Sequence, residues 1–217
     1  MVGAVALPLP IRNRLKDLIL TAFDDPGERE LVAALEGFWR GDSSDRLLSF
    51  DFFQRAAEGV RLAPWARPYH ALICERARAY GETLGRFERL PADEAADPMI
   101  RAGLLFNARC YFEAHEILEP PWIRAEGAGR QALQGLIQVA VGFQHLANGN
   151  VAGATALLQE GCDRLRANGF ALDLPVEQWA GEVRHCLEEV VALGPRAAEV
   201  FDWDRVPMWP TRQSPAT

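Results

Sequence analysis

The chain has 217 residues, of which 49% are hydrophobic and 24% are charged, and this is ordinary for a soluble globular protein with a proper core. Its formal net charge of −7 argues against non-specific binding to nucleic acid or to an anionic membrane, because both are negatively charged and bind positively charged proteins. Residues 131–159 are uncharged, but glutamines, a histidine and an Asn-Gly-Asn turn interrupt them, so they predict a buried helix and no membrane span.

The four cysteines are far apart in the sequence and form no Cys-x-x-Cys pair. We therefore expect free, mostly buried thiols in a cytoplasmic protein. The opening residues 1–10 lack a basic region and have only a short apolar run before their prolines, so they make a poor signal peptide. The cysteines are Cys74, Cys110, Cys162 and Cys186.

Apolar residues at helical spacing predict four helices before residue 91. The first begins at Pro10 and reaches Phe23, and residues 24–26 end it and cap a second helix that closes near Gly41. A break at residues 64–68 precedes a longer fourth helix. A third helix is expected after residues 42–45, because its apolar residues keep helical spacing: Leu48, Phe52, Ala56 and Val60.

Residues 91–97 are small, acidic and led by proline, and they form the best linker. Along the whole chain no run alternates with period two long enough to be a convincing strand, so the class is all-α. We expect an N-terminal helical region packed on the core (1–97), a helical bundle (98–194) and an irregular tail (195–217). The predicted bundle helices cover residues 98–107, residues 111–119 with Pro120-Pro121 as terminator, residues 130–147, a segment reaching Leu165, and residues 175–194.

Two segments that are 40 residues apart in the sequence have a similar pattern, namely residues 106–114 and 146–154. Each predicts a helix, a tight turn and a second helix with a small residue where the two helices approach. This pattern resembles the hairpin of tetratricopeptide-like repeats, but two units are too few for a solenoid. A bundle built from two helix-turn-helix hairpins, with additional N-terminal helices, is therefore the predicted fold.

Polar residues gather on two of the predicted helices. On the 111–119 helix, His115 and Glu119 lie one turn apart at the edge of the apolar face, whereas Glu113 is expected to point mostly to solvent. On the 130–147 helix, Gln134, Gln138 and His145 fall within one narrow stripe. Neutral hydrogen-bonding groups on such a stripe predict a desolvated polar layer that meets the 111–119 helix.

Three interpretations of this layer stay open. The polar groups satisfy one another inside the bundle and fix the helix register, or they line a small-molecule pocket. In the third interpretation His115, Glu119 and His145 bind a divalent metal, and Glu116 acts as general base of a hydrolase. No motif for a nucleophilic triad is present. The residues assigned to the polar layer or pocket are Glu116, Gln134, Gln138, Asn107 and Asn150.

The segment FDWDRVPMW, residues 201–209, is rich in large aromatic residues without helical spacing. We expect it to dock on its own domain, with a subunit contact as the alternative because tryptophan is enriched at interface anchors.

Residues 98–166 resemble the bacterial and archaeal domain-of-unknown-function family 309. The matching strings are Phe106-Asn107, the His-Glu-x-Leu-Glu segment 115–119 with Trp122, the Gln-Gly-Leu-Ile-Gln segment 134–138, and the Gly-Asn turn 149–150 followed by Gly-Ala. The resemblance implies a small all-helical bundle and no established activity. Where the family commonly has a glycine, this chain has Arg109, so a left-handed backbone there would be mildly strained.

The leading functional hypothesis is a binding or scaffold protein, and the alternative is the metal-dependent hydrolase. The expected partner is a small molecule or a protein, without nucleic acid or membrane, and the chain is expected to be a monomer or a homodimer.

Overall fold

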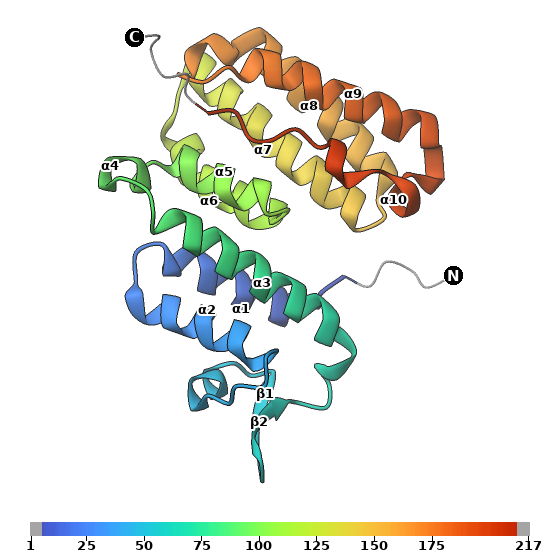
Figure 1. The fold of residues 1–217 in the computed structure, drawn as a ribbon. Helices are drawn as coiled ribbons and strands as arrows, with labels where there is room; N and C mark the ends of the chain where they lie inside the picture. The colour runs from blue at the N-terminus through green and yellow to red at the C-terminus, as the bar shows by residue number, and fades with distance from the viewer. Residues whose placement is uncertain (1–5, 212–217) are drawn as a thin grey trace. The chain divides into compact units, whose positions relative to one another are not determined.

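Helices make up most of residues 6–211, the part of the chain that the computed structural model describes, and this confirms the all-α fold class (Figure 1). The contacts divide the chain into two compact units, with the boundary between Pro91 and Ala92. The boundary lies at the start of the segment predicted as a linker. Residues 1–5 of the opening segment and residues 212–217 of the predicted tail lie outside the described residues.

The first unit contains three long helices: α1 (Leu9–Ala22), α2 (Pro26–Phe38) and α3 (His70–Phe87). Asp25 begins α2 as predicted, since its carboxylate accepts a hydrogen bond of 2.7 Å from the backbone N–H of Gly27. Apolar side chains at helical spacing fill the core of this unit, among them Ile11, Leu15, Leu35, Ile73 and Tyr80.

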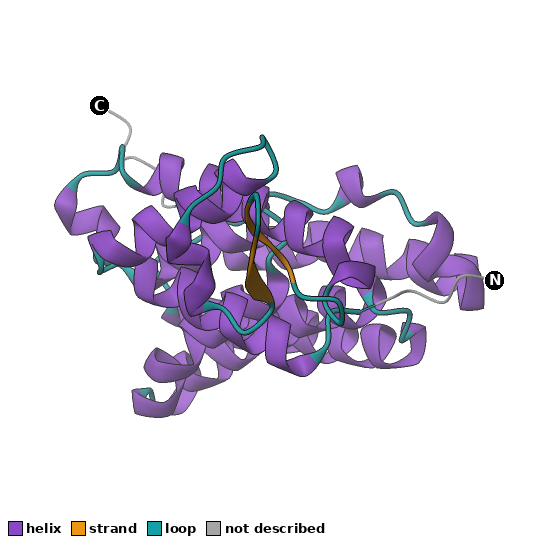
Figure 2. Ribbon diagram, turned by 90° about the horizontal axis from the view of Figure 1, so that it is seen from below, coloured by secondary structure: helices purple, strands orange, loops and turns teal. Residues whose placement is uncertain are grey.

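The predicted third helix is wrong. Residues 45–49 form a short 3-10 helix, η1 (Asp45–Ser49), and the following residues form a hairpin of β1 (Phe53–Ala56) and β2 (Gly59–Leu62). The strands pair antiparallel with Phe53 opposite Leu62, and they are the only strands within residues 6–211 (Figure 2). Burial along β2 alternates from residue to residue, which is the period of a strand and not of a helix.

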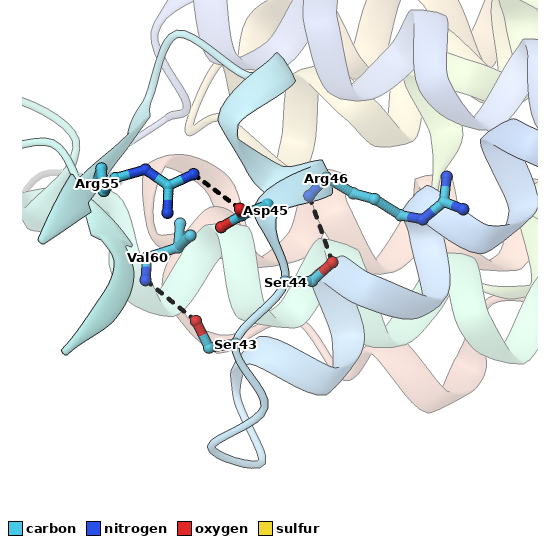
Figure 3. Close-up of polar contacts among 6 residues, drawn as sticks. All are labelled: Ser43, Ser44, Asp45, Arg46, Arg55 and Val60. Atoms are coloured by element: carbon cyan, nitrogen blue, oxygen red, sulfur yellow. Dashed lines mark hydrogen bonds and ion pairs between the residues drawn. The ribbon is translucent and has the colours of Figure 1, made fainter.

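Local contacts explain why the hairpin forms. Gly59 has a φ of 115°, which suits a turn and which a helix does not allow. The hydroxyl of Ser43 accepts a hydrogen bond of 3.1 Å from the N–H of Val60, so a side chain satisfies this donor of β2 (Figure 3). Asp45 pairs with Arg55 at 2.7 Å, and the hydrogen bond from Arg55 lowers the pKa of the Asp45 carboxyl.

The second unit contains the family-like segment and the tail. This unit has short 3-10 helices at residues 169–171, 194–196 and 203–205, and the first unit has another at residues 67–69. Asp97 caps the helix that starts at Pro98, as its carboxylate accepts a 2.8 Å hydrogen bond from the N–H of Met99. The helices of this unit are α4 (Ala92–Ala95), α5 (Pro98–Asn107), α6 (Tyr111–Arg124), α7 (Gly127–Ala147), α8 (Val151–Asn168), α9 (Val176–Leu193) and α10 (Ala197–Val200).

Helix α6 does not stop at the two prolines, so the predicted end at Glu119 is wrong. Pro120 and Pro121 lie inside the helix, which continues to Arg124. The guanidinium of Arg130 donates hydrogen bonds to the carbonyl oxygens of Trp122 (3.3 Å) and Ile123 (3.2 Å). The guanidinium carbon of Arg130, Cζ, also lies 4.5 Å from the centre of the Trp122 ring. These contacts satisfy terminal carbonyls beyond the prolines and stabilise the extra turn.

The two hairpins share one turn geometry, as the 40-residue offset predicts. At the end of α5 the N–H of Cys110 donates to the carbonyl of Leu105 at 2.8 Å, and at the end of α7 the N–H of Asn150 donates to that of His145 at 2.9 Å. Such a bond closes a helix when the preceding residue adopts a left-handed conformation. Arg109 (φ 59°) and Gly149 (φ 81°) take that position.

Arg109 is the only non-glycine residue with positive φ within residues 6–211, so the strain expected at this turn is present. Its side chain pairs with Asp204 at 2.6 Å, but both groups are exposed and the pair contributes little. We expect Arg109→Gly to be more stable than Arg109→Ala by about 1 kcal/mol, because both variants lack the ion pair and only glycine relieves the backbone. Urea denaturation of the two variants measures the difference, and equal stabilities would contradict the strain.

Candidate functional site

Helix α6 brings three of the predicted site residues together. The Nε2 atom of His115 lies 3.6 Å from a carboxylate oxygen of Glu116 and 3.8 Å from one of Glu119. The side chain of His115 is 13% exposed, whereas that of Glu119 is 48% exposed. The imidazole therefore lies close to two carboxylates, and one of the two is open to solvent.

The other ring nitrogen of His115 is a polar atom without a protein partner. Nδ1 is buried and forms no hydrogen bond with the described residues, while the ring packs edge-on against Phe112 at 4.9 Å. A buried imidazole nitrogen usually has a hydrogen-bond partner. His115 thus keeps a ring nitrogen that is free to form a further contact.

The polar stripe of α7 contacts α8, so the predicted polar layer between α7 and α6 is wrong. Gln138 is 8% exposed and donates a hydrogen bond of 2.6 Å to the carboxylate of Glu160. About two turns earlier, at the edge of the stripe, Gln131 accepts a hydrogen bond from the guanidinium of Arg164. Gln134 between them is half-buried. The helical wheel gives the correct face of α7 but not the helix that covers it.

His145 belongs to the turn between α7 and α8. Its Nδ1 lies 2.6 Å from the side-chain nitrogen of Asn150, whose carboxamide oxygen accepts a hydrogen bond from the N–H of Gly153. Asn150 thereby caps α8. His145, predicted as a metal ligand, therefore contacts Asn150, predicted as a pocket residue, and Asn150 serves as the cap of α8.

Glycines explain why α7 pairs with α8. A Cβ added at Gly161 would lie 2.9 Å from the carbonyl oxygen of Gly135, and one added at Gly135 would lie 3.0 Å from that of Gly161. A Cβ at Gly142 would lie 2.8 Å from Cγ of Leu158. The two backbones approach too closely for larger residues, and the polar side chains beside the glycines are brought within reach of α8.

The polar contacts continue from α8 to α9. Arg184 donates to Asp163 at 2.5 Å and to the carboxamide oxygen of Gln159 at 3.5 Å. Gln159 in turn donates to Asp163 at 2.6 Å, and this hydrogen bond, followed by the contacts with Arg184, lowers the pKa of the Asp163 carboxyl. Sequence reasoning missed Glu160, Arg164 and Arg184, although charged residues on a helix beside an all-neutral stripe are a usable signal.

Within residues 6–211, no three His, Cys, Asp or Glu side chains lie close enough together to hold a metal ion. His115 and Glu119 adjoin, but His145 does not complete a three-residue group with them. Glu113, expected at the solvent, is only 2% exposed, and that expectation is wrong.

Asn107 holds the C-terminal tail. Its carboxamide oxygen accepts a hydrogen bond of 2.7 Å from the backbone N–H of Trp209. The Trp209 ring lies 5.3 Å from that of Phe106 and 5.4 Å from that of Trp179. The predicted docking of the tail on its own domain is thus confirmed.

The cysteines are free thiols, as expected, and burial raises the pKa of both Cys162 and Cys186 from 9.0 to about 11. Between about pH 9 and 11 the unfolded chain loses protons that the folded chain keeps, so stability falls as the pH rises. We expect the melting temperature to decrease across this range, and to decrease less steeply in Cys162→Ala. Scanning calorimetry at several pH values measures the slope, and a slope unaffected by the substitution would exclude Cys162 as a cause.

None of the helices within residues 6–211 has the length and apolar character that a membrane span needs. No curated protein and no solved structure matches the chain. Residues 99–157, from α5 to the first two turns of α8, contain the paired hairpin turns, His115 and the polar stripe of α7. This segment matches the family described as Domain of unknown function (DUF309), which confirms the family resemblance of the sequence.

Proposed function

We propose that the chain is a cytoplasmic binding or scaffold module whose polar side chains, Gln138 buried among them, hold helices together. The observation that carries this proposal is the hydrogen bond between Gln138 and Glu160 across the α7–α8 contact. Two further side-chain hydrogen bonds, between Arg164 and Gln131 and between Asn150 and His145, also join α7 to α8 or to its N-terminal cap. Side chains engaged in this way fix the register of the helices, and they are not available as ligands or bases.

The alternative is a metal-dependent hydrolase. The proximity of His115, Glu116 and Glu119 supports it, since imidazole and carboxylate groups one turn apart are suitable ligands. In this alternative Glu116 is the general base, and a third ligand other than His145 has to come from a bound substrate or partner. The engagement of His145 by Asn150 favours the binding module.

Elemental analysis of protein purified without an affinity tag separates the two proposals. We expect no stoichiometric metal in the wild type, in His115→Ala or in the matched control His185→Ala, whose histidine is exposed on α9. Zinc, iron or manganese near one equivalent in the wild type and in the control, but absent from His115→Ala, would overturn the binding module, support the metal site and justify a screen for hydrolase activity.

A double-mutant cycle tests the structural role of the polar pair directly. If Gln138 and Glu160 stabilise the α7–α8 contact, Gln138→Ala and Glu160→Ala are non-additive by about 0.5–3 kcal/mol in urea denaturation. Additive effects would remove the observation on which the proposal rests.

A further inference from the structure

The tail of the second unit lies along α9 in the opposite direction. The carbonyl of Arg205 accepts a hydrogen bond of 3.3 Å from the thiol of Cys186, and the Trp209 ring lies beside Trp179, nearer the start of the helix. Figure 1 shows this segment in red, running back from α10 across the bundle. The segment after α10 therefore crosses the bundle and contributes Trp209 to the aromatic cluster around Phe106.

One residue anchors the tail. Trp209 is 4% exposed, and its ring packs against Phe106 and Trp179. Its backbone N–H donates to Asn107, so one side-chain acceptor fixes the position of the main chain at the anchor. An aromatic anchor in a pocket together with a backbone hydrogen bond is the way in which proteins hold extended peptides.

Gly103 shapes the pocket of this anchor. A Cβ at this position would lie 2.5 Å from Cδ1 and 2.8 Å from Cγ of Trp209, distances that real Cβ atoms do not show. The indole therefore lies directly on the α5 backbone, and any larger residue would displace it. We call the surface formed by Gly103, Phe106, Asn107 and Trp179 the tail site.

Two exposed ion pairs lie before the anchor. Asp204 pairs with Arg109 at 2.6 Å and Arg205 pairs with Glu189 at 2.8 Å. The side chains of Asp204, Arg109 and Arg205 are 89%, 52% and 58% exposed, so water and salt screen both pairs. The tail leaves α10 through Phe201 and Asp202, which are extended. After release of the anchor, the segment is still held by Phe201, which is 5% exposed, and by Trp203, whose ring centre lies 6.1 Å from that of Tyr111.

We propose that the tail site is a docking site for an extended, tryptophan-bearing segment, filled within the chain by its own tail and open to the tail of a second copy. The segment that fits the site is present in every copy, and all the contacts described above form equally when the tail comes from a neighbour. Reciprocal exchange of two tails gives a closed dimer with twofold symmetry. The inference rests on the proposal that the chain is a binding module and names the surface that binds.

A labelled synthetic peptide of residues 202–211 tests the site with the full-length chain. We expect the peptide to bind Trp209→Ala, whose own anchor is missing, at least tenfold more tightly than the wild type, in which the tethered tail competes at an effective concentration of about millimolar. The control peptide with alanine in place of Trp209 should not bind. Addition of Gly103→Ala to Trp209→Ala should abolish binding. A folded Trp209→Ala chain that does not bind the peptide overturns the proposal.

Exchange between wild-type chains provides a second test that does not depend on any variant folding. Nitrogen-15-labelled and unlabelled full-length chains are incubated together at high concentration and analysed by native mass spectrometry. Dimers of mixed mass support the exchange, and their loss in Gly103→Ala assigns them to the tail site. A wild type that stays monomeric overturns the exchange.

These outcomes are separate from those of the proposed function. Metal bound through His115 would overturn the binding module without affecting peptide binding at the tail site. Failure of peptide binding would overturn the tail site and leave the polar pair of Gln138 and Glu160 as it is.

Discussion

Replacement of Phe106 with alanine is expected to lower the free energy of unfolding by about 3–5 kcal/mol. Phe106 is 1% exposed, and its ring lies within 6 Å of four other aromatic rings. Alanine leaves a cavity where α5, α6, α7, α9 and the tail meet, and rigid aromatic neighbours cannot fill it. The four rings belong to Tyr111, Phe143, Trp179 and Trp209.

The matched control is Phe170→Ala. Phe170 is 75% exposed, so the same change should alter the free energy of unfolding by less than about 0.5 kcal/mol. Urea denaturation of both variants measures the effect. A small loss in Phe106→Ala would mean that the aromatic cluster does not form the centre of the unit.

The second large effect is expected at the contact between α7 and α8. In Gly161→Ala the new methyl group would lie 2.9 Å from the carbonyl oxygen of Gly135 and 3.1 Å from the backbone nitrogen of Val139. Backbone atoms cannot move aside as a flexible side chain can, so the helices must separate. We expect a loss of about 1–3 kcal/mol, measured by the shift in the midpoint of unfolding.

Gly181 on α9 offers the opposite case. No atom lies within 4 Å of a Cβ added there, and the residue lies inside a helix. Gly181→Ala should therefore stabilise the protein by about 0.5–1 kcal/mol through helix propensity alone. Destabilisation by both substitutions would indicate a general intolerance of alanine in this unit, and the close α7–α8 contact would not be needed to explain the loss at Gly161.

Much of the fold could be predicted from short-range patterns. The helix starts at Asp25 and Asp97 follow from carboxylates that cap N–H groups two residues later. The paired turns at Arg109 and Gly149 follow from the repeated segments, because a left-handed residue between two helices requires only local geometry.

The errors arise where tertiary contacts decide. Residues 53–62 contain apolar residues compatible with helical spacing, but Ser43, which lies before them in the sequence, holds Val60 in a hairpin. The signal that was available is the alternation of burial-prone and polar residues in Gly59–Leu62.

The candidate site shows the same limit. Periodicity placed Gln138 and His145 on one face of α7, but two helices, α6 and α8, were available to cover that face. Gly135 and Gly142 flank the stripe, and glycines in a helix mark a close neighbour, so they were the residues that pointed to α8. The acceptor on Glu160 could be identified only once the partner helix was known.

The glycine contacts between α7 and α8 also limit how the second unit can move. Because Gly135 and Gly161 face each other backbone to backbone, sliding or rotation of one helix past the other would force side chains into the gap. We therefore expect the two helices to keep their register in any rearrangement. Slow amide exchange in the middle of α7 and α8 would show that the two helices open last in this unit.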